Sequence, residues 1–341
     1  AATETAEDTL FPKPSVRFDS STSATAETGS HAITLSLDFP SGGTLTADVV
    51  VDITDNGTGT ANSGTDYTSI GVPATVTFVA GSGPGATQQV SITITPDTNV
   101  EGDETVDLQI TATSGPANLG STTNHTFTIT DDDTATIQFQ AASSATADEA
   151  SSTHNVVLVV NTPPGGAIHV PITVDITDAA SGSALSGTDY AAIGTQTVTF
   201  SAFSADGSTQ LGGVLVIQDT QVEGGETLTL ALSNPGSLAV VGATTQHTAT
   251  ITDDDEAQAR FQTGTSSVAE PNSRSIIVQL DTSGATLALD LTVEVADLLS
   301  GSATSNTDYT TFTTATVTFS SGAADGATQV ATLSTIDDGL V

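Results

Sequence analysis

Hydrophobic and polar residues alternate along most of the chain with a period of two. In the stretch HAITLSLDF, for example, Ile33, Leu35, Leu37 and Phe39 are separated by single polar residues. Similar runs occur at 16–18, 49–53, 76–78, 90–94, 106–110 and 127–129, with turns rich in Gly, Ser, Asp and Asn between them. Such alternation indicates strands with one buried face, and seven strands in about 120 residues favour an antiparallel β-sandwich.

This arrangement of strands and turns occurs three times in tandem. The motif GTDY at 64–67 recurs at 187–190 and as NTDY at 306–309, while VEGDET at 100–105 recurs as VEGGET at 222–227. We therefore divide the chain into a leader or linker at 1–15, repeats at 16–133 and 134–255, and an incomplete repeat at 256–341. No spacer separates the repeats, so we expect an all-β fold of tandem immunoglobulin-like sandwiches in an elongated array.

The chain is strongly acidic, with 40 acidic residues, 4 basic residues and a formal net charge of −36. Nucleic-acid binding is not expected, because phosphate contacts need clustered Lys and Arg. An anionic membrane surface would repel the chain, and the sequence has no apolar run long enough for membrane insertion. Cysteine is absent, so disulfides cannot hold the fold together. The natural partner for this charge is a cation.

Acidic side chains gather in the loops that follow the first, third, fifth and seventh strands of a repeat. If successive strands alternate in direction, these four loops lie at one pole, the pole joined to the next repeat. The candidate metal ligands are Glu27, Asp55, Asp97, Glu101, Glu104, Asp131, Asp132 and Asp133 in the first repeat, and Glu149, Asp178, Asp219, Glu223, Glu226, Asp253, Asp254 and Asp255 in the second. Carboxylates 4 Å apart repel by about 4 kcal/mol per pair at an effective dielectric of 20, which a bound cation would offset.

Calcium suits this set of ligands. Ca²⁺ takes roughly six to eight oxygen ligands with loose geometry, whereas Mg²⁺ demands a strict octahedron and few carboxylates. Zinc would need His or Cys, and the histidines show no ligand spacing, so we expect surface strand positions for His31, His125, His154, His169 and His247. The alternative is a solvated acidic pole that holds no ion.

The aspartates of the DY motif and the acids of the third repeat have a different expected role. Asp66, Asp189 and Asp308 each precede a tyrosine that we expect to point inward, so they should brace a turn through side-chain-to-backbone bonds. The third repeat retains Glu270, Asp297, Asp337 and Asp338 but lacks the acidic turn and the Asp triplet, so no complete ion site is expected there. It is either a piece of a longer array or a repeat whose missing strands come from a neighbouring chain.

The ordered motifs SGTDY, TVTF, ITPDTNVEGDETVDL and ITDDD resemble the Calx-β family, which includes regulatory domains of sodium–calcium exchangers and long arrays in bacterial surface proteins. The resemblance implies calcium sites built from an early Glu, an Asp after the third strand, the acidic turn and the terminal Asp run. These positions correspond to the sixteen acids named above. Gly225 stands where the first repeat has Asp103, and Asp97 and Asp219 stand alone, which implies fewer or weaker ions.

No catalytic constellation stands out, so we do not expect an enzyme. One hypothesis is a structural or adhesive segment of a secreted bacterial surface or filament protein, with Ca²⁺ at the domain poles stiffening the array. Its partners would be calcium and other copies or neighbouring repeats in a fibre, and its location extracellular, at the cell surface. The alternative is a calcium-responsive regulatory module, or a recognition module for carbohydrate or protein. Tandem repeats without linkers favour the first hypothesis.

Overall fold

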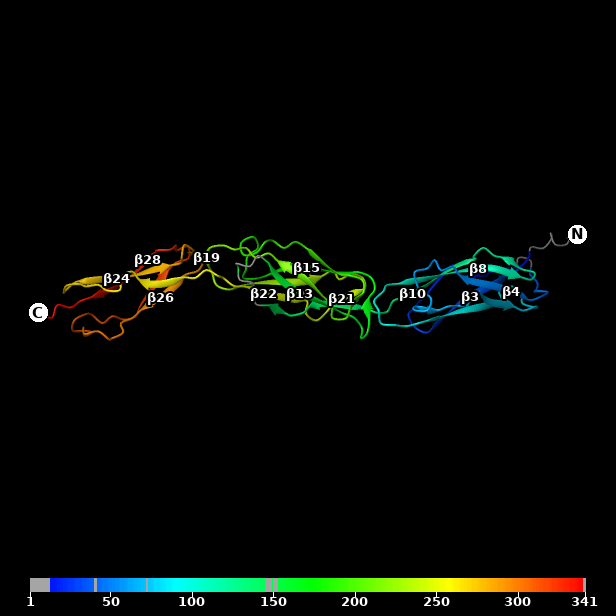
Figure 1. Cartoon of the computed structure of the whole chain (residues 1–341), viewed down its shortest axis with the longest axis horizontal. Helices are drawn as coiled ribbons and strands as arrows, with labels where there is room; N and C mark the ends of the chain where they lie inside the picture. Colours follow the sequence, from blue (N-terminus) through cyan, green and yellow to red (C-terminus); the bar gives the residue numbers. More distant parts are fainter. Residues whose placement is uncertain (1–12, 40–41, 72, 145–148, 150–152, 340–341) are drawn as a thin grey trace.

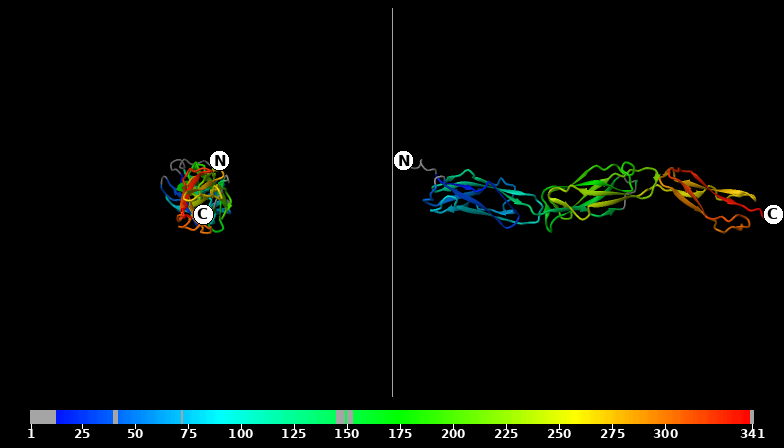
Figure 2. Two further views of the ribbon diagram at one scale, coloured as in Figure 1. Left: turned by 90° about the vertical axis from the view of Figure 1, so that its left-hand side faces the viewer. Right: turned by 180° about the vertical axis from the view of Figure 1, so that it is seen from behind.

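The computed structural model describes residues 13–39, 42–71, 73–144, 149 and 153–339, so most of the expected leader at 1–15 lies outside the described residues. The described part contains strands and no helix, and accordingly no helix that could span a membrane. Three sandwich-like units follow one another along a rod, with the first and third units at opposite tips (Figure 1). Seen end-on, the rod is narrow (Figure 2). The predicted all-β, elongated array of antiparallel sandwiches is confirmed.

The first unit consists of two five-stranded sheets. One sheet has the order β5 (Tyr67–Thr68), β7 (Thr87–Ile94), β3 (Ser30–Asp38), β1 (Ser15–Phe18), β9 (Asn118–Leu119). The other has the order β2 (Thr22–Ala26), β10 (Asn124–Thr130), β8 (Glu104–Ser114), β4 (Val49–Asp55), β6 (Ala74–Phe78). Neighbouring strands are antiparallel except for the pairs β1–β9 and β2–β10, in which the first strand of the repeat divides between the two sheets.

The second unit repeats this plan. One sheet has the order β18 (Thr209–Val214), β13 (His154–Asn161), β11 (Ala135–Phe139), β21 (Ala239–Val241). The other has the order β12 (Ser143–Ser144), β22 (Gln246–Ile251), β20 (Glu226–Ser233), β15 (Ile172–Gly182), β16 (Gln196–Phe200). A short ribbon of β14 (Ala167–Ile168) and β17 (Ser204–Ala205) lies at the end facing the first unit.

The third unit is smaller in the described residues. One sheet contains β23 (Gln258–Phe261), β24 (Ser273–Asp281) and β28 (Thr328–Ser334), and the other contains only β26 (Leu291–Val295) and β27 (Ala315–Phe319). A further short pair joins β19 (Gln221–Val222) of the second unit to β25 (Thr286–Leu287). Counterparts of β8 and β10 are missing from the described part of this unit.

The alternating hydrophobic residues form a separate core in each unit. In the first unit, the inward positions expected from the sequence are buried, apart from Phe39, which is only partly covered. Each sandwich also places phenylalanines at its centre, such as Phe18 and Phe127 in the first unit and Phe139 and Phe200 in the second. Burying one such side chain contributes about 1.5–3 kcal/mol, so the core offsets much of the entropy lost on folding.

Strand direction brings the acidic loops to one pole, as the sequence predicts. Strand β2 runs parallel to β10, and β4 is antiparallel to β8, which is itself antiparallel to β10. Strand β7 is antiparallel to β3, which is antiparallel to β1. The chain therefore leaves β2, β4, β7 and β10 at the same end, which faces the second unit. We call this end of a unit its junction pole.

Candidate metal centre

Two clusters of carboxylates lie at the junction pole of the first unit. Glu27, just after β2, lies with Asp97 and Asp133, and one oxygen of each is within 4.8 Å of the others. Asp66 lies with Glu101 and Glu104 within the same limit. Glu27 and Asp66 are only 5% and 6% exposed, so the charges are withdrawn from bulk water.

The junction pole of the second unit also carries two clusters, with a partly different membership. Glu149 lies with Asp253 and Asp254, and Asp189 lies with Asp219 and Glu223, again within 4.8 Å. Glu149 and Asp189 are 4% and 3% exposed. The described residues of the third unit contain no group of three carboxylates this close together.

The first aspartate of each triplet holds the acidic turn in place. Asp131 Oδ2 accepts bonds from the backbone N–H groups of Glu101 and Gly102 at 2.9 and 2.8 Å, and Asp131 Oδ1 accepts one from Asp133 at 2.9 Å. Asp253 does the same for Glu223 and Gly224 at 2.7 and 3.0 Å. These charge-assisted bonds tie the end of the last strand to the VEG motif.

The DY aspartates have a second role that the sequence analysis missed. Their expected turn-bracing bonds are present: Asp66 Oδ2 accepts from the backbone of Asn62 at 2.5 Å, and Asp189 accepts from the backbone of Leu185. The same residues also complete the second cluster at each pole. The backbone of Asp66 accepts a bond from Thr95 N at 2.9 Å, next to the acidic turn. The other members of the cluster lie far from Asp66 in the sequence. The only local sign of this role is therefore an acid that precedes an inward tyrosine.

Asp55 and Asp178 make different contacts from those expected of ligands. The hydroxyl of Tyr67 donates to Asp55 Oδ2, and Gly57 N donates to Oδ1 at 2.9 Å. Asp178 likewise accepts from Tyr190 at 2.6 Å and from Ala180 N at 2.8 Å. Neither aspartate belongs to a cluster, so these two side chains anchor the buried tyrosines, and their role as ligands stays a prediction.

The structure brings ten of the sixteen candidate ligands into the four clusters. The six outside the clusters are Asp55, Asp131, Asp132, Asp178, Glu226 and Asp255. Asp131 nevertheless lines a small cavity of about 10 Å³ with Glu27, Asp66, Glu101 and Glu104. Asp132 is exposed.

Burial and crowding change the acidity of the clusters. Burial raises the pKa of Glu27 to about 7, with the charge of Asp97 adding to the effect. Burial and a hydrogen bond with Asp66 raise the pKa of Glu104 to about 8. Glu149 and Glu226 in the second unit follow at about 7 and about 8, again chiefly because of burial. At neutral pH these poles therefore resist full ionisation unless positive charge is supplied.

Several buried carboxylate oxygens lack a hydrogen-bond donor among the described residues. They are Asp133 Oδ2, Glu149 Oε2, Glu226 Oε2 and Asp255 Oδ2. A buried acceptor without a donor is costly, and a hard cation satisfies such an oxygen without any donor. The donor set at each pole, oxygen atoms from several carboxylates, therefore fits a calcium ion.

The histidines do not contribute to these clusters, but the expectation of surface positions is wrong for three of them. His125, His154 and His247 are 3–7% exposed. The ring of His125 bonds the backbone oxygen of Ser20 at 2.7 Å and the hydroxyl of Ser23 at 2.7 Å, so both nitrogens are satisfied inside the sandwich. Burial lowers the pKa of His125, which keeps the ring neutral.

The acidic turn of the first unit also forms part of the second unit. Val100 is fully buried in the second core, its N–H donates to the carbonyl of Ala167 at 2.9 Å, and its carbonyl accepts from His169 N at 2.8 Å. The two units approach so closely that a Cβ added at Gly166 would lie 1.7 Å from the carbonyl oxygen of Thr98. The ring of His169 pairs with Glu101 across the same junction.

The second junction has the same construction. Strand β19 pairs in parallel with β25, and Thr286 N and Ala288 N donate to the carbonyls of Thr220 and Val222, each at 3.0 Å. Val222 packs against the third core. At both junctions, the valine of the VEG motif extends the sheet of the unit that follows.

Comparison with known proteins identifies the repeated unit. The model of the Calx-beta domain matches residues 12–133, 130–255 and 252–338. A search of curated proteins finds no match. Among solved structures, CBD12 from CALX1.2 is 15% identical with a TM-score of 0.32, covering 70% of this chain and 99% of that one. The apo-form Calx CBD1 domain is 20% identical with a TM-score of 0.31, covering 36% and 99%. Because the family model matches all three units, the chain belongs to the Calx-beta domain family.

Proposed function

We propose that this chain is a structural segment in which Ca²⁺ at the junction poles of the first two units stiffens the array. One observation carries the proposal: the acidic turn that supplies candidate ligands is the same turn that pairs with the next unit. Asp97 and Glu101 stand on either side of Asn99 and Val100, whose backbone and side chain contact the second unit.

The residues of the four clusters are those that would hold the ions. In the first unit, Glu27, Asp97 and Asp133 would hold one ion, and Asp66, Glu101 and Glu104 another. In the second unit, the corresponding sets would be Glu149, Asp253 and Asp254, and Asp189, Asp219 and Glu223. Bound Ca²⁺ supplies the positive charge that offsets repulsion within each cluster. Zinc suits the poles poorly, because it prefers His or Cys ligands and the four clusters consist of carboxylates alone.

Stiffening follows from how the turn is anchored. When the carboxylates are ionised and uncompensated, repulsion between Asp97 and Glu101 pushes the two ends of the turn apart. The bonds of Val100 to Ala167 and His169 then weaken, because the backbone that carries them moves. When the charges are compensated, the turn is fixed at both sides of the junction. Asp131 and the clusters bind it to the first unit, and Val100 binds it to the second unit.

The setting of this segment is part of the proposal. A secreted bacterial surface or filament protein is supported by the linear array and the near absence of lysine, with only Lys13 present. Extracellular calcium modules work with dissociation constants of roughly 0.1–1 mM, which suits sites with few carboxylates. Other copies of the chain would be the partners in a fibre.

A calcium titration of the whole chain tests the proposal. We expect heat on binding and a higher melting temperature, since a ligand at about 100 times its Kd stabilises the folded state by about 2.7 kcal/mol. Glu104→Gln should weaken binding. Asp103→Asn is the matched control, because Asp103 is an exposed acid in the same turn that lies outside both clusters and is glycine in the second unit. Absence of both heat and a melting shift at millimolar Ca²⁺ would refute calcium binding.

A further inference from the structure

Two junctions join the three units of the rod (Figure 1), and they share a backbone pairing but differ in side chains. At the first junction, between the first and second units, the N–H of His169 donates to the carbonyl of Val100 at 2.8 Å. At the second junction, the N–H of Ala288 donates to the carbonyl of Val222 at 3.0 Å. The same point therefore carries an imidazole at the first junction and only a methyl group at the second.

A second pair of matched positions lies in the neighbouring turn. Phe203 N donates to the carbonyl of Ile168 at 2.6 Å, and Gly322 N donates to the carbonyl of Leu287 at 2.7 Å. The angle φ is +66° at Phe203 and +82° at Gly322. In the first unit this position is Gly81, with φ of +93°. Phe203 thus occupies a left-handed position that the other two units give to glycine.

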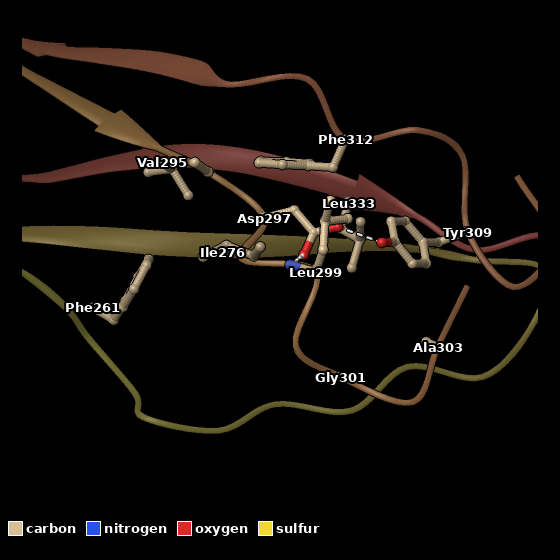
Figure 3. Close-up of a pocket in the computed structure, with 11 residues that line it drawn as sticks. Phe261, Ile276, Val295, Asp297, Leu299, Gly301, Ala303, Tyr309, Phe312 and Leu333 are labelled. Atoms are coloured by element: carbon tan, nitrogen blue, oxygen red, sulfur yellow. Dashed lines mark hydrogen bonds between the residues drawn. The ribbon is translucent and has the colours of Figure 1, made fainter. Parts of the chain in front are cut away.

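The third unit otherwise repeats the plan of the second, including the pole that lies away from the second junction. There the hydroxyl of Tyr309 donates to Asp297 (Figure 3), as the hydroxyl of Tyr190 donates to Asp178 in the second unit. The two junctions therefore differ through particular side chains on a shared backbone plan.

The contact between Phe203 and His169 explains why a bulky residue stands at a left-handed position. A phenylalanine is strained there, and such strain persists only where the surrounding structure offsets it. The ring centroids of Phe203 and His169 lie 5.3 Å apart, with the ring planes tilted by 48°. Phe203 is 76% exposed, so its ring serves the imidazole at the junction rather than the core of the second unit.

The same imidazole contacts the acidic turn of the first unit. Nδ1 of His169 pairs with Glu101 Oε1, and an Nδ1–H can donate there whether the ring is neutral or protonated. Burial and the charge of Asp97 raise the pKa of Glu101, and His169 acts in the opposite direction. Burial also raises the pKa of Glu223, the matching acid at the second junction, where every other influence comes from an aspartate. In the described part of the chain, only Glu101 of these two acids pairs with a side chain across its junction.

We propose that His169 and Phe203 form a side-chain clamp that restrains the first junction without any ion, so that the second junction is the more flexible joint of the array. His169 binds the acidic turn, and Phe203 keeps the imidazole in the orientation that reaches Glu101. A hydrogen bond across a junction restrains it, because tilting the units apart breaks the bond. Removing calcium would then loosen the second junction more than the first, and only this last consequence rests on the proposed function.

Hydrogen exchange of the whole chain in chelator, resolved to single amides by NMR, tests the clamp. His169→Ala and Phe203→Gly, alone and together, give the first junction the side chains of the second. Protection of the Val100 amide and of the amide at position 169 should fall about three- to tenfold, the factor expected for one lost hydrogen bond. Core amides of β3 and β13 should keep their protection. Ser201→Ala, an exposed residue in the same loop as Phe203, is the matched control and should change neither set.

Pulsed electron paramagnetic resonance compares the two junctions directly in the same chelator buffer. Spin labels on Ser91→Cys and Leu211→Cys span the first junction, and labels on Leu211→Cys and Val330→Cys span the second, all at exposed strand positions. The first distribution of distances should be the narrower, and His169→Ala with Phe203→Gly should broaden it to the width of the second. Equal widths before substitution, or no broadening after it, would overturn the clamp. Because calcium is absent throughout, failure of calcium binding leaves this result unaffected.

Discussion

Shortening Val100 to alanine tests whether the acidic turn of the first unit is part of the core of the second. The side chain is fully buried there, and the substitution leaves the backbone bonds to Ala167 and His169 in place. Removing two buried methyl groups costs about 1.6 kcal/mol in transfer free energy. The remaining cavity raises the loss to about 2–3 kcal/mol. This loss should appear as destabilisation of the second unit.

Hydrogen exchange read by mass spectrometry separates the two units within the whole chain. Core amides of β13 and β15 should exchange about 30- to 140-fold faster in Val100→Ala, because every 1.4 kcal/mol is a factor of ten, while β3 and β8 keep their rates. Val79→Ala, at a site that is 58% exposed in the first unit, should change neither set. Faster exchange in β3 and β8 with no change in β13 and β15 would refute the reasoning.

Two further predictions concern the acidic poles. With calcium chelated, the melting temperature should fall as pH rises from 5 to 8. The pKa values of Glu27 and Glu104 in the folded chain are about 7 and about 8, against an ordinary 4.5. The folded chain therefore binds more protons than the unfolded chain across this range, and raising the pH favours the unfolded chain. Saturating Ca²⁺ should abolish this fall, and thermal scans that show the same slope in both conditions would contradict it. At pH 8 in chelator, Glu27→Gln should stabilise the first unit by up to about 3 kcal/mol, the cost of ionising a group with this pKa, and calorimetry should show weaker calcium binding. Asp103→Asn, measured alongside, should do neither.

Much of the fold can be predicted from the sequence, because the alternation of hydrophobic and polar residues indicates which face of each strand is buried. Ile33, Leu35 and Leu37 occupy the core as expected, and alternating strand directions bring Glu27 and Asp133 together from opposite ends of the repeat. These inferences need only the period of two and the order of strands. The internal repeat then transfers them from the first unit to the second.

The sequence does not reveal contacts made by loop segments, because these lack the alternation of hydrophobic and polar residues that marks a strand. Val100 lies among polar loop residues, and its partner Ala167 is in the next unit, so no local pattern marks it as a core residue. Asp66 and Asp55 differ in surroundings through the placement of Tyr67, whose hydroxyl takes Asp55 as its partner. Both are loop aspartates in the sequence, and only the folded geometry separates a cluster member from an anchor for tyrosine.

Calcium-dependent stiffness of the first junction is the central claim, and a distance distribution across that junction tests it most directly. The chain has no cysteine, so spin labels on Ser91→Cys and Leu211→Cys, both exposed strand positions, would be the only ones present. Pulsed electron paramagnetic resonance should give a narrow distribution of distances in saturating Ca²⁺ and a markedly broader one in chelator. Distributions of equal width in the two conditions, with calcium binding verified in the same sample, would contradict the claim.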